Sequence, residues 1–424
     1  MLISFTVENF GSIRDEQTIS LVACNYYKER EEWLARAAAP GLAGCSVLKA
    51  AGIYGANAAG KSMVLDALSV MRRVVRESPA LMPDAALPYV PFRLGARRAG
   101  APTRFGVEFL HGGRRYEYSF SYLPAEVVSE RLVRYETSRA QLLFERGRAG
   151  DGALELKLTG RTRALRRHEA FLRAKPTSLL LSRGAQEGDA ILAEPYEWLS
   201  RRLAVTRGTN PSPAAYGPVL DGELGEGLRE RLVSMTRLAD LGVTDVRVKE
   251  VPPLPEERLR EIYSEELARR LGDSVGKRAA FVHAAAEGDV EFAPGEESLG
   301  TETFFSIAAN VLRALSDGST LAVDEVDASL HPSLTEAVLA LFGDERTNPL
   351  EAQLIFTAHD TGLMDSLRRD QLWLVSKDAA GATSVEPMSD YAPRKGERLS
   401  SGYEAGRYGA VPLVYSLLGG GEAV

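Results

Sequence analysis

The stretch that decides the fold is Gly55-Ala56-Asn57-Ala58-Ala59-Gly60-Lys61-Ser62, which fits the pattern G-x-x-x-x-G-K-[ST]. It follows the apolar run Val47–Tyr54 and precedes a segment whose apolar residues recur with helical spacing. A buried strand that leads into a glycine-rich loop and then a helix is the nucleotide-binding unit of α/β proteins. The glycines let successive backbone N–H groups point at phosphate oxygens, and the helix N-terminus adds a partial positive charge.

This loop predicts a phosphate site formed by Gly55, Asn57, Ala58, Gly60, Lys61, Ser62 and Met63. We expect the Lys61 amine to reach the β- and γ-phosphates, where it would also assist catalysis, and the Ser62 hydroxyl to bind Mg²⁺. The alternative is a glycine-rich turn that contains Lys and Ser by chance. The strand before the loop and the helix after it favour the phosphate site.

Two further apolar strands end in polar residues. Leu321-Ala322-Val323-Asp324-Glu325 predicts a Mg²⁺ ligand at Asp324 and a catalytic carboxylate at Glu325 that orients and deprotonates the attacking water. The run Gln353–Asp360 ends in a polar segment that contains His359, which we expect to bond the γ-phosphate and to detect its loss. The alternatives are a solvated strand-end acid for Glu325 and a structural histidine for His359.

A signature-like segment precedes the Asp324 strand. Ser298-Leu299-Gly300-Thr301-Glu302 stands before the apolar helix Phe304–Leu315, so a hydroxyl and backbone N–H groups lie at a helix start. With the order of the other motifs, this segment resembles the S-x-G-T-[KE] variant of the ABC-ATPase signature. The alternative is an ordinary helix cap made by Ser298 or Thr301.

The resemblance to ABC ATPases implies a composite site. Ser298, Gly300 and Thr301 would bind the ATP held by the P-loop of a second copy, so the chain would form at least a head-to-tail homodimer around two ATP molecules. The run Asp327–His331 would lie at that interface like the D-loop of the family.

Other segments indicate a branch of this class. The opening Val7–Ile13 resembles the NFRSI start of the RecF, SMC and overcoming-lysogenisation-defect branch, although Gly11 replaces the usual basic residue. Further matches resemble the subgroup of prokaryotic ATPases found in abortive-infection and other antiphage systems; they are Asp324–Asp327, Ser329–Pro332, Gln353–Asp360, Arg369–Trp373 and Gly406–Pro412. Only 65 residues follow His359, too few for a fused TOPRIM nuclease, so the resemblance implies a separate effector, a nuclease or toxin.

Composition limits the partners. The chain carries 51 Lys+Arg against 58 Asp+Glu, a net charge of -7, so nucleic-acid binding remains possible only through a local basic face. One candidate is the run from Arg161 to Lys175 with six basic residues, which is either a solvated helix face or a docking surface. The two cysteines fit no metal pattern, and no apolar stretch of membrane-spanning length or signal peptide is present, so we expect a cytoplasmic protein without a membrane partner.

The predicted fold class is α/β: a P-loop NTPase of the ABC-ATPase type with an antiparallel β subdomain and a mostly helical insert. We expect residues 1–159 to form the first half of the core, 160–295 the insert and 296–424 the second half. Several predicted elements support this division. They are a hairpin (Arg104–Leu110 with Arg115–Tyr122), a charged helix (Pro255–Leu271), a second hairpin (Ala279–Ala285 with Asp289–Ala293) and three strands (Thr320–Val323, Gln353–Phe356 and Gln371–Val375).

Three functions compete. The first is an ATP-driven switch that controls an effector in antiphage defence. The second is a DNA-repair or chromosome-processing ATPase of the RecF/SMC type, which the negative net charge and the lack of a long coiled coil disfavour. The third is the nucleotide-binding subunit of a transporter, which the opening Val7–Ile13 and the signature variant disfavour.

Overall fold

The computed structural model describes residues 1–36, 40–42, 44–82, 85–95, 100–150, 153–208, 225–239, 242–251, 257, 276–391 and 398–410. Two compact units make up this part of the chain. The first comprises Met1–Thr206, Ala314–Val326 and Leu339–Val424, and the second comprises Arg207–Arg313 and Asp327–Val338. Each unit is described by itself below.

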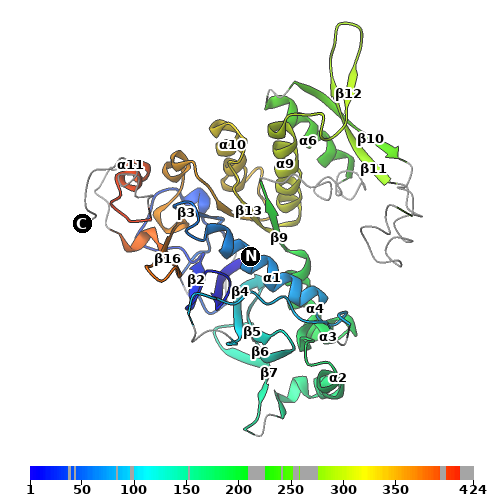
Figure 1. Ribbon diagram of the computed structural model, residues 1–424, viewed down its shortest axis with the longest axis vertical. Helices are drawn as coiled ribbons and strands as arrows, with labels where there is room; N and C mark the ends of the chain where they lie inside the picture. The colour runs from blue at the N-terminus through cyan, green and yellow to red at the C-terminus, as the bar shows by residue number, and fades with distance from the viewer. Residues whose placement is uncertain are drawn as a thin grey trace. The chain divides into compact units, whose positions relative to one another are not determined.

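A six-stranded sheet in the order β16-β15-β3-β14-β13-β9 organises the first unit (Figure 1). Its four central strands β15, β3, β14 and β13 run parallel, and β16 pairs antiparallel with β15. The strand bounds are Ala50–Gly55 for β3, Leu203–Arg207 for β9, Thr320–Asp324 for β13, Gln353–Thr357 for β14, Leu372–Lys377 for β15 and Thr383–Pro387 for β16. Every residue of β13 and β14 is buried, as expected for strands covered on both faces. The predicted α/β class is therefore confirmed.

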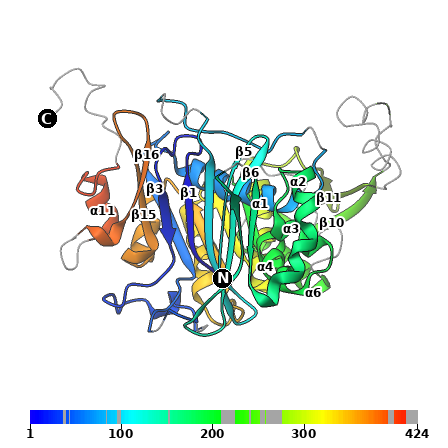
Figure 2. The same cartoon turned by 90° about the horizontal axis from the view of Figure 1, so that it is seen from below.

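A seven-stranded antiparallel sheet has the order β2-β1-β4-β5-β6-β7-β8. Figure 2 shows several of its strands side by side, with α3 and α4 beside them. The predicted hairpin is present as β4 and β5, joined through Gly112 and Gly113, which both have positive φ. The bounds are Leu2–Glu8 for β1, Gln17–Ser20 for β2, Thr103–His111 for β4, Arg114–Leu123 for β5, Glu126–Tyr135 for β6, Ala140–Arg148 for β7 and Leu154–Leu158 for β8.

Helix α1 (Lys61–Glu77) packs against strands of both sheets, because it contacts β1 as well as β3 and β13. Its apolar residues recur on one face, and they are buried in the same core as the inward side chains of the two sheets; these residues are Val64, Leu65, Ala67, Leu68, Met71, Val74 and Val75. Full burial of each large aliphatic side chain stabilises the fold by about 2 kcal/mol. The start of α1, which follows the P-loop, is thereby fixed from two sides.

The side chain of Gln353 joins the two sheets inside the core. Its Oε1 accepts hydrogen bonds from the backbone N–H of Leu2 at 2.5 Å and from the Thr320 hydroxyl at 2.9 Å. Its Nε2 donates to the carbonyl oxygens of Leu2 and Leu48, both at 2.9 Å. Gln353 is fully buried, so these four bonds replace the water that the amide would otherwise hold.

Helices follow the antiparallel sheet in the chain, in the first part of the segment 160–295 that the sequence predicts to be mostly helical: η2 (Gly160–His168), α2 (Glu169–Ala174), α3 (Leu180–Gln186) and α4 (Ala190–Arg201). The start of α3 is held by the buried carboxylate of Glu130 on β6, which accepts from the N–H groups of Leu180 at 2.7 Å and Leu181 at 3.0 Å. Burial raises the pKa of Glu130, and the guanidinium of Arg146 opposes that rise.

Shorter elements complete the first unit: η1 (Glu31–Trp33), η3 (Thr361–Ser366), η4 (Arg369–Gln371), η5 (Met388–Asp390) and α11 (Leu399–Glu404). Among the helices of the described residues, none combines the length and the apolar character needed to cross a bilayer.

The second unit contains α6 (Gly225–Leu238) and a three-stranded antiparallel sheet, β10-β11-β12. The predicted second hairpin is confirmed as β11 (Gly276–His283) and β12 (Val290–Phe292). The mostly helical character predicted for 160–295 is wrong for this part, because β10 (Val243–Val251) pairs along the whole of β11. The predicted helix Pro255–Leu271 lies, apart from Glu257, outside the described residues.

Two longer helices begin in the second unit and end in the first. Helix α9 (Leu299–Asp317) leads into β13, and α10 (Pro332–Gly343) precedes β14 in the chain. The sequence predicts an apolar helix at Phe304–Leu315, and α9 contains this segment but begins five residues before it.

The basic run Arg161–Lys175 is partly structural. The Lys175 amine donates to the carbonyl oxygen of Pro79 at 2.7 Å and to that of Leu81, and burial lowers the pKa of this amine. Arg167 pairs with Asp189 at 3.3 Å, and Arg173 pairs with Glu169 at 2.8 Å. These internal contacts favour the prediction of a solvated helix face over that of a docking surface.

We expect Gln353→Leu to lower the free energy of unfolding by about 3 kcal/mol, since leucine keeps the volume but leaves the buried N–H and C=O of Leu2 and the C=O of Leu48 without their partner. Urea unfolding followed by circular dichroism measures this loss. Gln186→Leu, at an exposed position, is the matched control and should change stability little. Equal stability of the two variants would contradict the role of Gln353.

Candidate functional site

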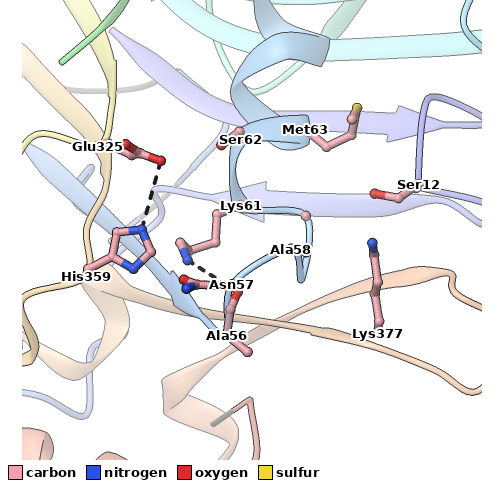
Figure 3. A pocket seen from close by; sticks show the side chains of 11 residues that line it. Ser12, Ala56, Asn57, Ala58, Lys61, Ser62, Met63, Glu325, His359 and Lys377 are labelled. Atoms are coloured by element: carbon pink, nitrogen blue, oxygen red, sulfur yellow. Dashed lines mark hydrogen bonds and ion pairs between the residues drawn. The ribbon is translucent and has the colours of Figure 1, made fainter. Parts of the chain in front are cut away.

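A cavity of about 720 Å³ lies where the carboxyl ends of the parallel strands meet (Figure 3). Eleven residues of the first unit line it: Ser12, Ala56, Asn57, Ala58, Gly60, Lys61, Ser62, Met63, Glu325, His359 and Lys377. The structure therefore brings the predicted loop residues together with the predicted catalytic carboxylate and the predicted switch histidine. Gly55 and Asp324, the other two predicted residues of this unit, end the strands β3 and β13 that lead into the site.

The backbone of the loop requires its glycines. Gly60 has φ +115°, and a Cβ there would lie 2.3 Å from the Thr383 hydroxyl oxygen. A Cβ on Gly55 would lie 2.2 Å from the carbonyl oxygen of Val375 on the neighbouring strand β15. These close approaches place the loop tightly against β15 and β16.

Lys61 is the first residue of α1 and is largely buried. Its amine donates to the carbonyl oxygen of Gly55 at 2.8 Å and to that of Ala56 at 3.4 Å. The side chain thus folds back over the loop that precedes it (Figure 3). A cation in this position raises the affinity of the cavity for a polyanion.

The Thr357 hydroxyl holds the two strand-end acids in place. It donates to Asp324 Oδ1 at 2.7 Å and accepts from the backbone N–H of Glu325, also at 2.7 Å. Thr357 is fully buried at the end of β14, and Asp324 is buried at the end of the adjacent β13. One hydroxyl therefore fixes the orientation of the Asp324 carboxylate and the backbone of Glu325.

Glu325 and His359 face each other across the cavity mouth, with 4.0 Å between Glu325 Oε1 and His359 Nε2 (Figure 3). Both side chains are partly exposed, so both can meet a ligand and water. Glu325 has φ +55°, in the left-handed region that non-glycine residues rarely adopt. The bond from its N–H to Thr357 stabilises this conformation, which ends the strand and turns the chain at the cavity.

The available donors suit a hard divalent cation. The Ser62 hydroxyl and the Asp324 carboxylate are oxygen ligands, which Mg²⁺ prefers. In the part of the chain that the structure describes, no group of three or more His, Cys, Asp or Glu residues could hold a metal. A Mg²⁺ ion at this place would therefore need oxygens from a bound phosphate and water, as it does in many phosphate-binding sites.

Ser298, Gly300 and Thr301 belong to the second unit, at the start of α9. The Ser298 hydroxyl accepts from the backbone N–H of Thr301 at 3.1 Å. Ser298 therefore caps the helix, as the alternative prediction of an ordinary helix cap expects. A Cβ on Gly300 would lie 3.0 Å from the carbonyl oxygen of Ser329, which brings the predicted D-loop close to this helix start. Ser298 and Leu299 are exposed, and Leu299 is unusually so for a large apolar residue.

Sequence reasoning missed four residues of the site: Ser12, Thr357, Thr383 and Lys377. Thr383 lies beneath the loop, donates its hydroxyl to the carbonyl oxygen of Ala59 at 2.9 Å, and contacts the Ser12 hydroxyl at 2.7 Å. Each of these residues comes from a strand end or a strand-flanking turn far from the loop in sequence. Thr357 is the polar residue directly after the apolar run Gln353–Phe356. This position was the available signal, since strand ends in parallel sheets converge on one edge.

A search of the curated proteins finds no match to this chain. A family model described as "AAA domain, putative AbiEii toxin, Type IV TA system" matches residues 50–365. The matched region begins with strand β3 and contains the loop residues Gly55–Ser62, the strand-end acids Asp324 and Glu325, and His359. Because the match covers about three quarters of the 424 residues, the chain belongs to this family of AAA-domain P-loop proteins.

Proposed function

We propose that this protein is a Mg²⁺-dependent ATPase of the ABC type that acts as a molecular switch. In this proposal two copies close around ATP, hydrolysis reopens them, and the two states control a separate effector, a nuclease or toxin, in antiphage defence. The observation that carries the proposal is the cavity in which the P-loop, Glu325 and His359 meet.

The cavity offers what a triphosphate needs. Its loop leads into the start of α1, where backbone N–H groups favour an anion, and Lys61 adds a positive charge beside the loop. At one end, Glu325 and His359 stand 4.0 Å apart, where the last phosphate of a bound triphosphate would lie. In this arrangement Glu325 orients and deprotonates a water molecule, and His359 bonds the γ-phosphate.

The metal site follows from the same geometry. Ser62 and Asp324 would hold Mg²⁺, with the Asp324 carboxylate kept in place by Thr357. When bound, the ion supplies positive charge to the phosphate oxygens as the transfer proceeds. The protein itself would hold the oxygens of Ser62 and Asp324 in one orientation and exclude other orientations of these side chains.

The proposed composite site rests on the start of α9. Ser298 is exposed there, its hydroxyl caps the helix start by accepting from the N–H of Thr301, and exposed Leu299 adjoins it. Such a helix start attracts an anion. The closeness of Gly300 to the Ser329 carbonyl supports a single interface made from both segments. We infer that a second copy brings this surface to the γ-phosphate.

The switch follows from binding thermodynamics. ATP can shift the chain from open to closed only as far as its contacts differ between the two states. His359 lies in the same cavity as the P-loop and would contact the γ-phosphate in either state, whereas the contact with the partner's Ser298 would exist only in the closed state. Both contacts would disappear on hydrolysis. The family description, with its toxin–antitoxin system, supports a context in which such a switch acts on a partner protein.

One prediction of this proposal concerns assembly. Glu325→Gln keeps the side-chain size but removes the base, so ATP should persist and the closed dimer should accumulate. With ATP and Mg²⁺, light scattering after size exclusion should give at least twice the 46.0 kDa mass of one chain, and a lower mass after EDTA.

A second substitution makes this result specific. Ser298→Asp, added to Glu325→Gln, preserves a good helix cap but places a negative charge where the γ-phosphate would bind. It should abolish the ATP-linked increase in mass, whereas Ser316→Asp near the other end of α9 should not. An unchanged assembly in the Ser298→Asp variant would refute the contact in trans.

A further prediction concerns Thr357. Thr357→Val removes the hydroxyl that orients Asp324 and the Glu325 backbone, so kcat for ATP hydrolysis should fall by about tenfold or more. Thr357→Ser keeps the hydroxyl and should retain most of the activity. The assay is steady-state phosphate release at saturating Mg²⁺. Equal rates in the two variants would mean that the bridge has no role in catalysis.

A further inference from the structure

Two residues outside the P-loop, Ser12 and Lys377, line the end of the cavity away from Glu325 and His359 (Figure 3). Lys377 is the last residue of β15, and its side chain extends toward Ser12. The function proposed above uses neither residue. Their chemistry differs from that of the loop, which offers mostly backbone N–H groups.

The position of Lys377 is fixed by the same sheet that fixes the loop. Strand β15 pairs with β3 so that Val375 lies opposite Gly55, the first residue of the P-loop. On its other side, Lys377 lies opposite Thr383, whose hydroxyl binds the P-loop at Ala59. The lysine backbone therefore cannot move away from the loop without a change in the sheet.

The charge of Lys377 is available to a ligand. Within the described residues, its amine makes no ion pair or hydrogen bond. The adjacent carboxylate of Asp378 is engaged elsewhere: it accepts from the N–H groups of Ala380 and Ala382, both at 2.8 Å, and pairs with Arg14 at 3.2 Å. These contacts keep the carboxylate on the turn and hold the pKa of Asp378 below its usual value.

Ser12 marks where a phosphate chain must end. The Thr383 hydroxyl donates its only proton to the carbonyl of Ala59, so in the 2.7 Å contact between the two hydroxyls Ser12 must be the donor. The lone pairs of Ser12 are left for other partners. They repel phosphate oxygens and suit a hydroxyl donor, such as a sugar hydroxyl.

We propose that Lys377 binds the α-phosphate of the nucleotide and so fixes the nucleoside end of the site. This inference rests on the proposed function, which puts the γ-phosphate at Glu325 and His359. The phosphate chain would then run along Lys61 and Ser62 to Met63, and its first phosphate would meet the Lys377 amine before the acceptor Ser12. The contact serves ATP, ADP and AMP alike, so it provides affinity without distinguishing the two states of the switch.

The test is a calorimetric titration of the full chain with ATP, ADP and AMP, using wild type and Lys377→Gln. ATP is titrated in the Glu325→Gln background, so that it is not consumed. The loss of one charge-assisted phosphate contact should weaken the binding of ATP and of ADP by the same factor, roughly tenfold. The binding of AMP should weaken by a similar factor where it is measurable. Lys377→Arg should restore most of the affinity, and Lys157→Gln, at an exposed lysine on β8, should change none of the three.

Two results would overturn the proposal. A loss confined to ATP would assign Lys377 to the γ-phosphate, and unchanged affinities would make it a solvated lysine. Lys61→Ala provides the reference for a loss that affects ATP and ADP more than AMP. If the wild-type chain bound neither ATP nor ADP, the proposed function would fall together with this inference. If it bound both and Lys377→Gln were unaffected, only the inference would fall.

Discussion

The parallel pairing of β3 with β14 on one side and β15 on the other is the constraint on which the site depends. This pairing aligns the carboxyl ends of the strands, so that Gly55, Thr357 and Lys377 reach the same edge of the sheet although more than 300 residues separate the first from the others. The next strand, β13, brings Asp324 and Glu325 to that edge. A shift of one residue in the register of any of these strand pairs would turn the side chains of the shifted strand to the opposite face of the sheet, and the cavity would be lost.

Buried polar contacts convert this alignment into a defined geometry. Gln353 fastens β14 to the first strand of the antiparallel sheet, and four residues later Thr357 fastens the end of β14 to Asp324 and Glu325. On the other side, Thr383 supports the P-loop from below. Because each of these groups is buried, the loss of a partner leaves an unsatisfied polar atom, which is more costly than at a surface. The positions of the site residues are therefore coupled to the stability of the sheet.

The sequence predicted the elements that have strong local patterns. The apolar runs before the loop, before Asp324 and before His359 all form strands, and α1 and the β4–β5 hairpin lie where the patterns indicate. Strand β10 was missed because its alternation of valine with charged residues stands between segments that read as helices. Lys377 and Ser12 could not be found from local pattern, since strand pairing brings Lys377 to the loop and hydrogen bonds with Thr383 bring Ser12 there. Thr357 is visible in the sequence as a strand-end residue, but its bond to Asp324 depends on the order of strands in the sheet.

A composite ATP site is the central claim, and complementation between two inactive variants tests it most directly. Lys61→Ala disables the P-loop of one chain, while Ser298→Asp disables the signature-like segment of the other. If ATP is held between copies, each variant alone should be inactive, and a mixture should regain hydrolysis, because a mixed pair has one site with an intact loop and an intact partner segment. If each chain hydrolyses ATP by itself, Ser298→Asp alone should remain active, or mixing should restore nothing. Phosphate release measured as a function of the mixing ratio separates the two outcomes, with a maximum near equal amounts expected for the composite site.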